Sequence, residues 1–201
     1  GDYQLLKAEV QRILALMGRE QIDFLNFPFL QSALDADPEY LEKMRHNIAA
    51  LKREGLIRFA SADNFSGEST YLSQVDAGCF DALAMNFSFA DDGALQSVLP
   101  RAGAQGMGVI TRELFQKGQL FKMGDEVGLV DRDLLSRMAI KWNLSIPTIT
   151  TSLIGADNTA HLQNSLSAVA EPELIDSENA VFATLRTAPT YSEYAEGRRA
   201  R

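Results

Sequence analysis

Apolar residues recur along the chain with two alternating periods, one typical of helices and the other of strands. Leu6, Val10, Leu14 and Met17 follow helical spacing, which predicts an amphipathic helix over residues 3–18 that ends at Gly18. Short apolar runs predict strands at residues 22–27, 56–62, 80–87, 108–111 and 148–154. Helical spacing predicts further helices at residues 38–55, 68–75, 94–104, 131–142 and 159–168. Residues 115–130, which include three glycines, are expected to form a mobile loop.

This alternation of strands and helices predicts an α/β fold, with a parallel sheet of about five strands covered by helices. Right-handed crossovers place the carboxyl end of every strand at one rim, where ligands bind in open sheets and barrels alike. The polar residues expected at this rim are Asn26, Asp63, Asn64, Asn86, Arg112, Glu113 and Asp157. We assign residues 1–170 to the βα domain and residues 171–201 to a C-terminal helix and tail.

The stretch at residues 148–168 contains the most informative turn of the chain. A β-branched run breaks at Gly155 and is followed by a helix whose N-cap is Asp157 or Asn158. The apolar stripe of that helix consists of Leu162, Leu166 and Val169. Such a turn directs unpaired N–H groups and the positive end of a helix toward one point, which suits a phosphate. An ordinary βα connection without a ligand is the simpler interpretation of the same pattern.

Composition and charge narrow the classes of function. The 201 residues are 46% hydrophobic, which is enough for a sizeable core. No apolar run approaches the ~20 residues that a membrane-spanning helix needs. The net charge of −8 disfavours binding to nucleic acid or to anionic membranes. The lone Cys79 excludes an internal disulfide and favours a reducing cytoplasm, and neither His46 nor His161 has the spacing of a metal site.

Five consecutive segments resemble the C-terminal five-eighths of an aldo-keto reductase, over about residues 5–170. They are Ile22-Asp-Phe-Leu, Glu54-Gly-Leu-Ile-Arg-Phe with Asp63-Asn64-Phe65, Phe80-Asp-Ala-Leu, the run from Gly106 to Leu120, and Leu153-Ile-Gly-Ala-Asp-Asn158. Their order and spacing make the resemblance specific. It implies a partial (β/α) TIM-type barrel from a family whose complete barrels have eight strands, bind NADPH and reduce aldehydes or ketones.

The resemblance also implies which positions contact a cofactor. Asp63 and Asn64 fall where the family holds the nicotinamide carboxamide, and Thr111 and Arg112 fall beside the nicotinamide ring. The positions near the pyrophosphate and the adenosine phosphate are Leu114, Gly118, Leu120, Gly155, Ala156, Asp157 and Asn158. The negative charge of Asp157, together with the lack of Lys or Arg at residues 152–170, implies poor binding of the 2′-phosphate of NADPH. NADH, or no cofactor, is therefore an alternative to NADP, and no metal is implied.

This sequence lacks the catalytic residues of the family. Three of the four residues lie on the first three βα units, which have no counterpart here, and the fourth, a histidine, falls on Pro28. We therefore predict no catalytic residue, and a degenerate or partner-dependent module that binds a small-molecule or nucleotide ligand. One alternative is an active NAD(P)H-dependent aldehyde or ketone reductase whose N-terminal third lies outside this chain. Another is a non-catalytic regulatory or structural subunit.

The number of strands also predicts that the chain associates with a second copy or with another chain. Five parallel strands leave two sheet edges unpaired and a barrel interior uncovered, which makes a chain prone to aggregate. We therefore expect a homo-oligomer, or a partner chain that completes the barrel.

Overall fold

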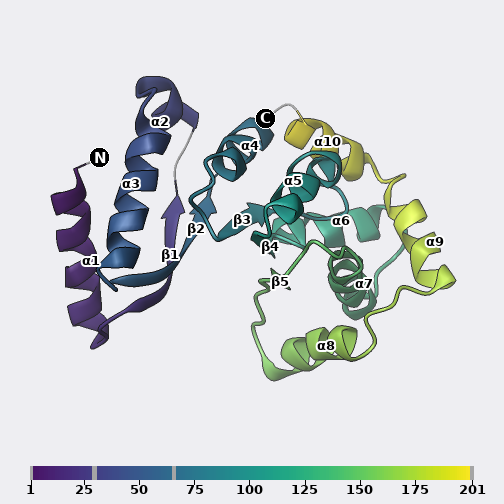
Figure 1. The fold of residues 1–201 in the computed structure, drawn as a ribbon. Helices are drawn as coiled ribbons and strands as arrows, with labels where there is room; N and C mark the ends of the chain where they lie inside the picture. The colour runs from purple at the N-terminus through teal and green to yellow at the C-terminus, as the bar shows by residue number, and fades with distance from the viewer. Residues whose placement is uncertain (1, 29–30, 65–66, 200–201) are drawn as a thin grey trace. The chain divides into compact units, whose positions relative to one another are not determined.

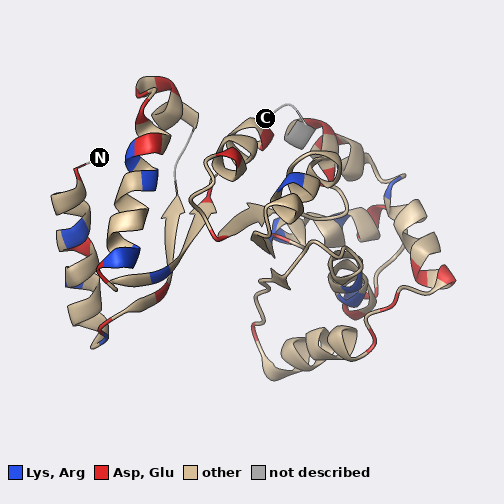
Figure 2. Ribbon diagram, in the orientation of Figure 1, with Lys and Arg blue, Asp and Glu red and all other residues tan. Residues whose placement is uncertain are grey.

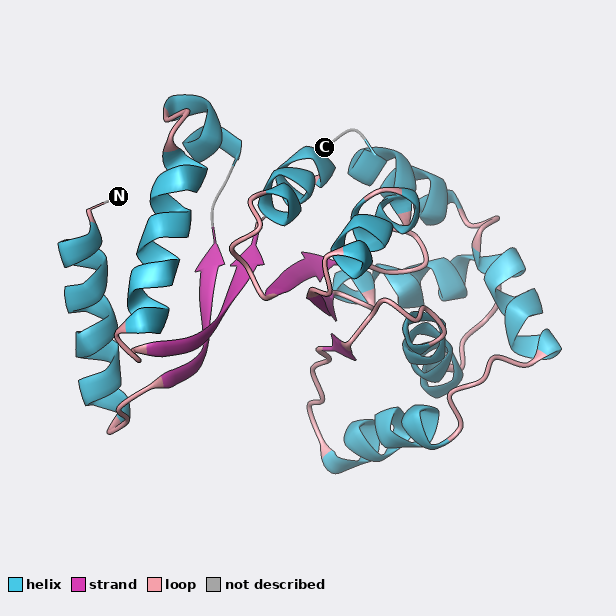
Figure 3. Cartoon of the chain, viewed as in Figure 1, coloured by secondary structure: helices cyan, strands magenta, loops and turns pink. Residues whose placement is uncertain are grey.

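The computed structural model of the chain describes residues 2–28, 31–64 and 67–199. Phe65 of the resemblance and the last two residues of the predicted tail lie outside the described residues. Strands alternate with helices (Figures 1 and 3) and form an open parallel sheet in the order β1-β2-β3-β4-β5. The strands are β1 (Ile22–Pro28), β2 (Ile57–Asp63), β3 (Ala82–Asn86), β4 (Gly108–Arg112) and β5 (Thr151–Ser152). The predicted α/β class with about five parallel strands is confirmed.

The chain divides into two compact units, of which unit 1 comprises residues 1–84 and 100–108. Its helices are α1 (Tyr3–Met17), α2 (Gln31–Ala36), α3 (Tyr40–Arg53), α4 (Glu68–Asp76) and most of α5 (Val98–Ala104). The α1 helix starts where the Asp2 carboxylate accepts a hydrogen bond from the Gln4 N–H at 2.7 Å. It ends at Gly18, whose φ of 61° lies in the left-handed region that favours glycine. Figure 1 shows α1 and α3 beside β1 and β2, which they cover.

Asp81 joins α3 to the sheet at the start of β3. Its carboxylate accepts from the Lys52 ammonium at 2.6 Å and from the Ala60 backbone N–H, on β2, at 2.7 Å. Parallel pairing continues from there and places Asp63 opposite Ala84. One carboxylate therefore sets the position of β2 relative to β3, and with it the carboxyl end of β2.

Unit 2 comprises residues 85–99 and 109–201. Its helical segments are the 3-10 turns η1 (Gly93–Gln96) and η2 (Gln116–Gly118), followed by α6 (Gln119–Glu126), α7 (Arg132–Leu144), α8 (Thr159–Ala170), α9 (Asp176–Leu185) and α10 (Pro189–Arg199). Phe89 packs against Phe182 of α9 and Tyr191 of α10, with ring centroids 5.2 and 5.8 Å apart. Further members of this core are Leu120, Met123, Leu135, Met138 and Leu185. The domain boundary predicted after residue 170 stays a prediction, although α9 and α10 both pack on this core.

The structure corrects three predicted elements of unit 2. Residues 115–130 are not a loop, because they contain α6, whose Leu120 and Met123 are fully buried. The strand predicted at residues 148–154 pairs only at Thr151 and Ser152. The tail predicted at the end of residues 171–201 contains the helix α10, whose Thr190 backbone N–H donates to the Glu126 carboxylate of α6 at 3.0 Å. In each case contacts distant in sequence override the local pattern.

The apolar stripe predicted for α8 lies on the solvent-exposed face of the helix and not on its buried face. Leu162, Leu166 and Val169 are 48, 58 and 56% exposed, whereas the buried positions of this helix are Ser165 and Ala168. Small side chains therefore allow α8 to pack closely against the rest of unit 2, and α7 is its main neighbour. The helix carries no Lys, Arg, Asp or Glu, as Figure 2 shows, so its outer face is apolar and uncharged.

A buried ion pair ties α7 to α9. The Lys141 ammonium lies 3.0 and 3.2 Å from the two carboxylate oxygens of Glu178, and the two residues are only 7 and 8% exposed. Burial alone would raise the pKa of Glu178, but the Ile175 N–H and the Lys141 ammonium outweigh it, so this pKa lies below its ordinary value.

Lys141→Met should destabilise the protein, because it leaves a buried carboxylate without its cation. We expect the free energy of unfolding at pH 7 to fall by about 3 kcal/mol, measured by urea unfolding. The matched control is Lys122→Met, at an exposed lysine 3.9 Å from Glu126, and its loss should stay below about 1 kcal/mol. Equal urea midpoints for the two variants would contradict a stabilising role for the pair.

The same pair predicts a pH dependence. Because the folded-state pKa of Glu178 is lowered, its contribution to stability is complete above the unfolded value of about 4.3. That contribution is lost as the pH falls through the folded-state pKa. The stability difference between the native chain and Lys141→Met should therefore shrink below about pH 4.

Candidate functional site

The predicted site residues of unit 1 lie at the carboxyl end of β2 and are buried in a hydrogen-bond network. The Asp63 carboxylate accepts from the Asn26 amide at 3.2 Å, and the Asp63 carbonyl accepts from the Gln74 amide at 2.9 Å. Asn64 is fully buried, and its side-chain oxygen accepts from the Gly67 N–H at 3.2 Å. Asp63 and Asn64 thus connect β1, β2 and α4, which gives them a structural role whether or not they bind a ligand.

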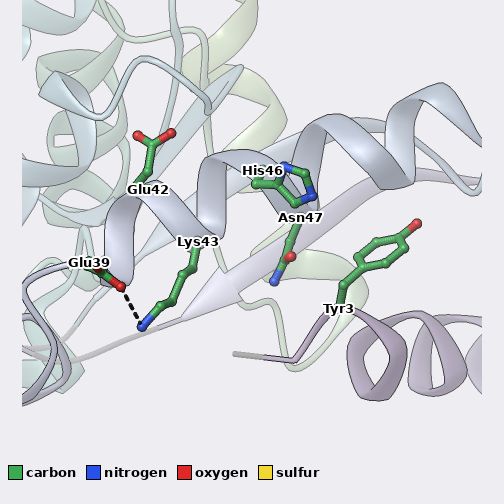
Figure 4. Close-up of a pocket in the computed structure, with 6 residues that line it drawn as sticks. All are labelled: Tyr3, Glu39, Glu42, Lys43, His46 and Asn47. Carbon is green, nitrogen blue, oxygen red and sulfur yellow. Dashed lines mark ion pairs between the residues drawn. The ribbon is translucent and has the colours of Figure 1, made fainter.

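A hollow of about 560 Å³ also belongs to unit 1 and lies between α1 and α3. It is lined by Tyr3, Glu39, Glu42, Lys43, His46 and Asn47, which Figure 4 shows as sticks. The Lys43 ammonium already pairs with Glu39 at 3.3 Å and with Asp37 at 2.9 Å. The Tyr3 hydroxyl points away from Lys43 and donates to Glu54 at 2.8 Å. None of its lining residues is a predicted site position, whereas the smaller pocket of unit 2 includes two, so we take the pocket of unit 2 as the candidate site.

In unit 2, the Thr111 hydroxyl connects the end of β4 to the helix α7 and to the strand β5. It donates to the Asn143 side-chain oxygen of α7 at 3.0 Å, so the Ser152 hydroxyl of β5, 2.8 Å away, donates to it in turn. The Leu153 N–H donates to the Thr111 carbonyl at 2.7 Å. This fully buried threonine therefore holds the short β5 strand in place.

Four other predicted positions follow Thr111 and serve the fold. Arg112 donates from Nε to the Asn86 side-chain oxygen at 2.7 Å, which joins the ends of β4 and β3 within unit 2. Leu114 and Leu120 are buried in its two apolar clusters. Gly118 has a φ of 92°, a left-handed conformation that glycine adopts without strain, and it precedes α6. None of these four lines the pocket of unit 2 described below.

The loop after β4 stores backbone strain. Glu113, Gln116 and Lys117 have φ values of 61, 54 and 55°, in the region that side chains other than glycine rarely adopt. Gln116 is fully buried and donates to the Ser88 hydroxyl at 2.8 Å, but its oxygen has no hydrogen-bond partner among the described residues. Strained conformations of this kind cluster at ligand-binding and catalytic loops.

The turn after β5 leads into α8. Asn158 is the N-cap, because its side-chain oxygen accepts from the His161 N–H at 2.9 Å. Gly155 and Ala156 are exposed, and the Asp157 side chain is 96% exposed, 3.8 Å from the His161 ring nitrogen. Of the two N-caps that the sequence leaves open, the structure uses Asn158.

A pocket of about 180 Å³ lies where this turn meets α7 and the strained loop. Its lining residues are Phe115, Phe121, Arg132, Asp133, Ser136, Gly155, Asp157, His161, Asn164 and Ser165. The Arg132 guanidinium lies 5.3 Å from the centre of the Phe121 ring. The pocket therefore combines an aromatic wall, one arginine and two carboxylates, a chemistry suited to a planar heterocycle with polar substituents.

Only two predicted site residues, Gly155 and Asp157, line this pocket. The sequence interpretation missed Phe115, Phe121, Arg132 and Asp133. A partial signal existed, because Arg132 and Asp133 open the helix predicted to begin at residue 131, next to the predicted rim. Phe121 gave no such signal, since it lies in the stretch expected to be a loop.

Two classes of site find no support among the described residues. No group of three or more His, Cys, Asp or Glu side chains there is arranged to hold a metal ion. Within the same part of the chain, no helix has the length and apolar character needed to cross a membrane.

Comparison with solved structures identifies the fold. An aldo-keto reductase from Bacillus halodurans, in its holo form, superposes with a TM-score of 0.73 and 17% identity, over 96% of this chain and 71% of that one. Its apo form gives 0.72 and 18%, over 96 and 72% of the two chains. A Pseudomonas aeruginosa protein provisionally assigned as an aldo-keto reductase gives 0.60 and 20%, over 85 and 58%. No protein-family model matches the sequence, and a search of curated proteins finds no relative.

The chain therefore has part of an aldo-keto-reductase-like fold, with an open sheet. The predicted resemblance is confirmed at the level of the fold. The predicted cofactor positions stay predictions.

Cys79 should be unreactive, which argues against a thiolate nucleophile in unit 1. Burial, opposed by Arg45 and Lys52, raises the pKa of this thiol to about 11. At pH 8 only about one thiol in a thousand is then ionised, against about one in four for an unperturbed cysteine. We expect labelling by a disulfide reagent at pH 8 to be more than about a hundredfold slower in the native chain than in urea. Equal rates in the two conditions would show that the thiol is exposed and ordinary.

Proposed function

We propose that this chain is an aldo-keto-reductase-like module that binds a nicotinamide dinucleotide in unit 2, and that its own residues do not form a complete catalytic set. The observation that carries the proposal is the pocket between the strained loop, α7 and the turn at Gly155. The pocket lies at the carboxyl side of β4 and β5, the side on which open and closed parallel sheets bind ligands. The aldo-keto-reductase-like fold supports a dinucleotide over other planar ligands.

The residues of unit 2 fit the adenosine end of such a ligand. The Arg132 guanidinium and the Phe121 ring offer a stacking surface for a base. The pocket of about 180 Å³ is smaller than the ~300 Å³ at which pockets for whole drug-sized ligands begin, so it would hold only part of a dinucleotide. When bound, the nicotinamide ring of such a ligand would supply or accept a hydride.

Pro28 supports an incomplete catalytic set. It is the last residue of β1, at the position where the resemblance places a histidine. A proline has no N–H and no titratable group, so it can neither donate a proton nor polarise a carbonyl. The remaining catalytic groups of the family have no counterpart in this sequence, so we infer that any reduction needs groups from outside these residues. A cytoplasmic location, favoured by the single cysteine, also stays a prediction.

Arg132→Gln should weaken dinucleotide binding, because it removes the cation that faces the aromatic wall. We expect micromolar binding of NADH to the native chain, measured by fluorescence titration, and about five- to tenfold weaker binding to the variant. The matched control is Arg186→Gln, at the exposed C-terminal end of α9, which should bind like the native chain.

The outcomes separate the alternatives. If neither NADH nor NADPH binds, the dinucleotide proposal is wrong, and a regulatory or structural subunit becomes the better description. If the purified chain alone oxidises NADH or NADPH when an aldehyde is added, the catalytic set is complete and the active-reductase alternative is correct.

We further infer that a βα segment from outside these residues covers the outer face of α8. β5 is last in the strand order, so its outer edge pairs with no strand among the described residues. The apolar, uncharged stripe of α8 belongs to the same unit as this edge. A second copy of the chain, a partner chain or another part of the same polypeptide would each bury both features and complete the sheet.

Replacing the stripe should reduce association. We expect the native chain to associate in a concentration-dependent way, as seen by light scattering coupled to size-exclusion chromatography. The double variant Leu162→Gln with Leu166→Gln should shift it toward monomer, because two exposed apolar side chains are removed from one face. The control is Val130→Gln with Ile175→Gln, two residues of similar exposure outside the stripe. A native chain that stays monomeric and well behaved at every concentration would contradict this inference.

A further inference from the structure

The exposed side of α1 carries a stripe of four residues that is apolar at both ends and charged in the middle. These residues are Leu5, Glu9, Arg12 and Leu16, whose spacing keeps them on one side of a helix. Leu5 and Leu16 are 72 and 75% exposed, the highest values of any large apolar side chain among the described residues. We call this set the α1 stripe.

The other sides of α1 make contacts within unit 1. Val10 and Leu14 are buried in its core. On the side toward α3, the Tyr3 hydroxyl donates to the Glu54 carboxylate at 2.8 Å, and the Lys7 ammonium lies 2.6 Å from the same carboxylate. Figure 1 shows α3 beside α1. The α1 stripe is therefore the side of the helix that is available to another molecule.

The α1 stripe is self-complementary when its direction is reversed. The midpoint between Leu5 and Leu16 along the helix is also the midpoint between Glu9 and Arg12. When two copies of α1 are placed antiparallel about this point, Leu5 of one copy lies opposite Leu16 of the other, about 8 Å from the axis. Glu9 of each copy then lies opposite Arg12 of the other. The same patch on both partners is the requirement for an interface with two-fold symmetry.

The charges of the α1 stripe favour this antiparallel arrangement. Arg12 donates from Nε and Nη2 to the Glu9 carboxylate at 2.9 and 2.6 Å, so the stripe is neutral although each chain carries a net charge of −8. A guanidinium has five N–H donors, so the Arg12 donors left over can bond the Glu9 of a second copy. A parallel arrangement would instead place like charges opposite each other, which is unfavourable.

We propose that two copies of this chain associate through the α1 stripe, as an antiparallel pair of helices about a two-fold axis. The contact differs from the one inferred at α8, because it belongs to unit 1 and leaves the sheet edges unpaired. It is also independent of the proposed function, since no residue of the dinucleotide pocket takes part. A single pair of helices buries less area than a standard interface, so we expect a dissociation constant on the order of 100 µM.

The test is sedimentation equilibrium of charge variants, in the Leu162→Gln with Leu166→Gln chain so that association through α8 does not contribute. Arg12→Glu makes the centre of the α1 stripe wholly acidic, and Glu9→Arg makes it wholly basic. Each should weaken self-association about tenfold or more, because like charges then meet at the axis. An equimolar mixture of the two variants should form a dimer again, because an acidic stripe then faces a basic one.

The matched control is Arg58→Glu, the same change in charge on β2, outside the α1 stripe. The Arg58 side chain is 62% exposed and that of Arg12 is 58% exposed, so the two variants are comparable. The control should dimerise like the chain without it. Equal urea midpoints for the two variants would show that a loss of association is not a loss of folding.

Three results would each overturn the inference. The first is a chain that stays monomeric up to about 500 µM before any charge is changed, well above the expected dissociation constant. The second is an Arg12→Glu chain that associates as tightly as the Arg58→Glu control. The third is a mixture of Arg12→Glu and Glu9→Arg that does not associate, since the contact would then not be an antiparallel pairing of α1. None of these results bears on dinucleotide binding, which is measured separately.

Discussion

The Thr111 hydroxyl is the contact on which the architecture of unit 2 depends. With only two residues in β5, the sheet ladder alone gives this strand few hydrogen bonds, and Thr111 adds a buried link to β5 and to α7. An unpaired buried hydroxyl or amide costs about 1–3 kcal/mol, so the three groups strongly favour this one arrangement. The strained loop begins directly after β4 and the Gly155 turn directly after β5, so the shape of the pocket follows from this contact.

Most elements could be predicted from the sequence, because their apolar spacing and end signals agree. The α1 helix is an example, since Asp2 and Gly18 close it by local hydrogen bonds alone. The failures lie where tertiary contacts decide. The α6 helix contains Gly124, a poor helix former, yet it is continuous because Leu120 and Met123 are buried in a cluster with residues of α7, α9 and α10. Conversely, α8 has a regular apolar stripe, but it turns Ser165 and Ala168 inward because small side chains allow close packing.

The site was less predictable than the fold, and for a physical reason. Residues 152–170, around the last turn, contain no Lys or Arg, so the local sequence offers no cation. The pocket instead recruits Arg132 and Asp133 from the preceding helix and Phe121 from α6, and such neighbours can be found only once the helices are packed. Two of the positions that the resemblance names, Gly155 and Asp157, line this pocket. It also named Leu114 and Leu120, which are buried in the core of unit 2, so a motif position can be kept for packing alone.

Under the proposed function, binding and catalysis would depend on different parts of this chain, so one could be lost without the other. The proline at the end of β1 has no proton to donate, and it costs the strand little, because β1 is at the edge of the sheet in the strand order. The loop after β4, in contrast, has a conformational cost. Its three left-handed residues each cost free energy, of order 1 kcal/mol, and local contacts offset part of that cost, because Gln116 donates to Ser88 and Lys117 pairs with Glu113. Relief of such strain by substitution is easily reached, since a glycine suffices at any of the three positions. Phe115, which lines the pocket of unit 2, lies between these strained residues, so their conformations fix the position of one wall of the pocket.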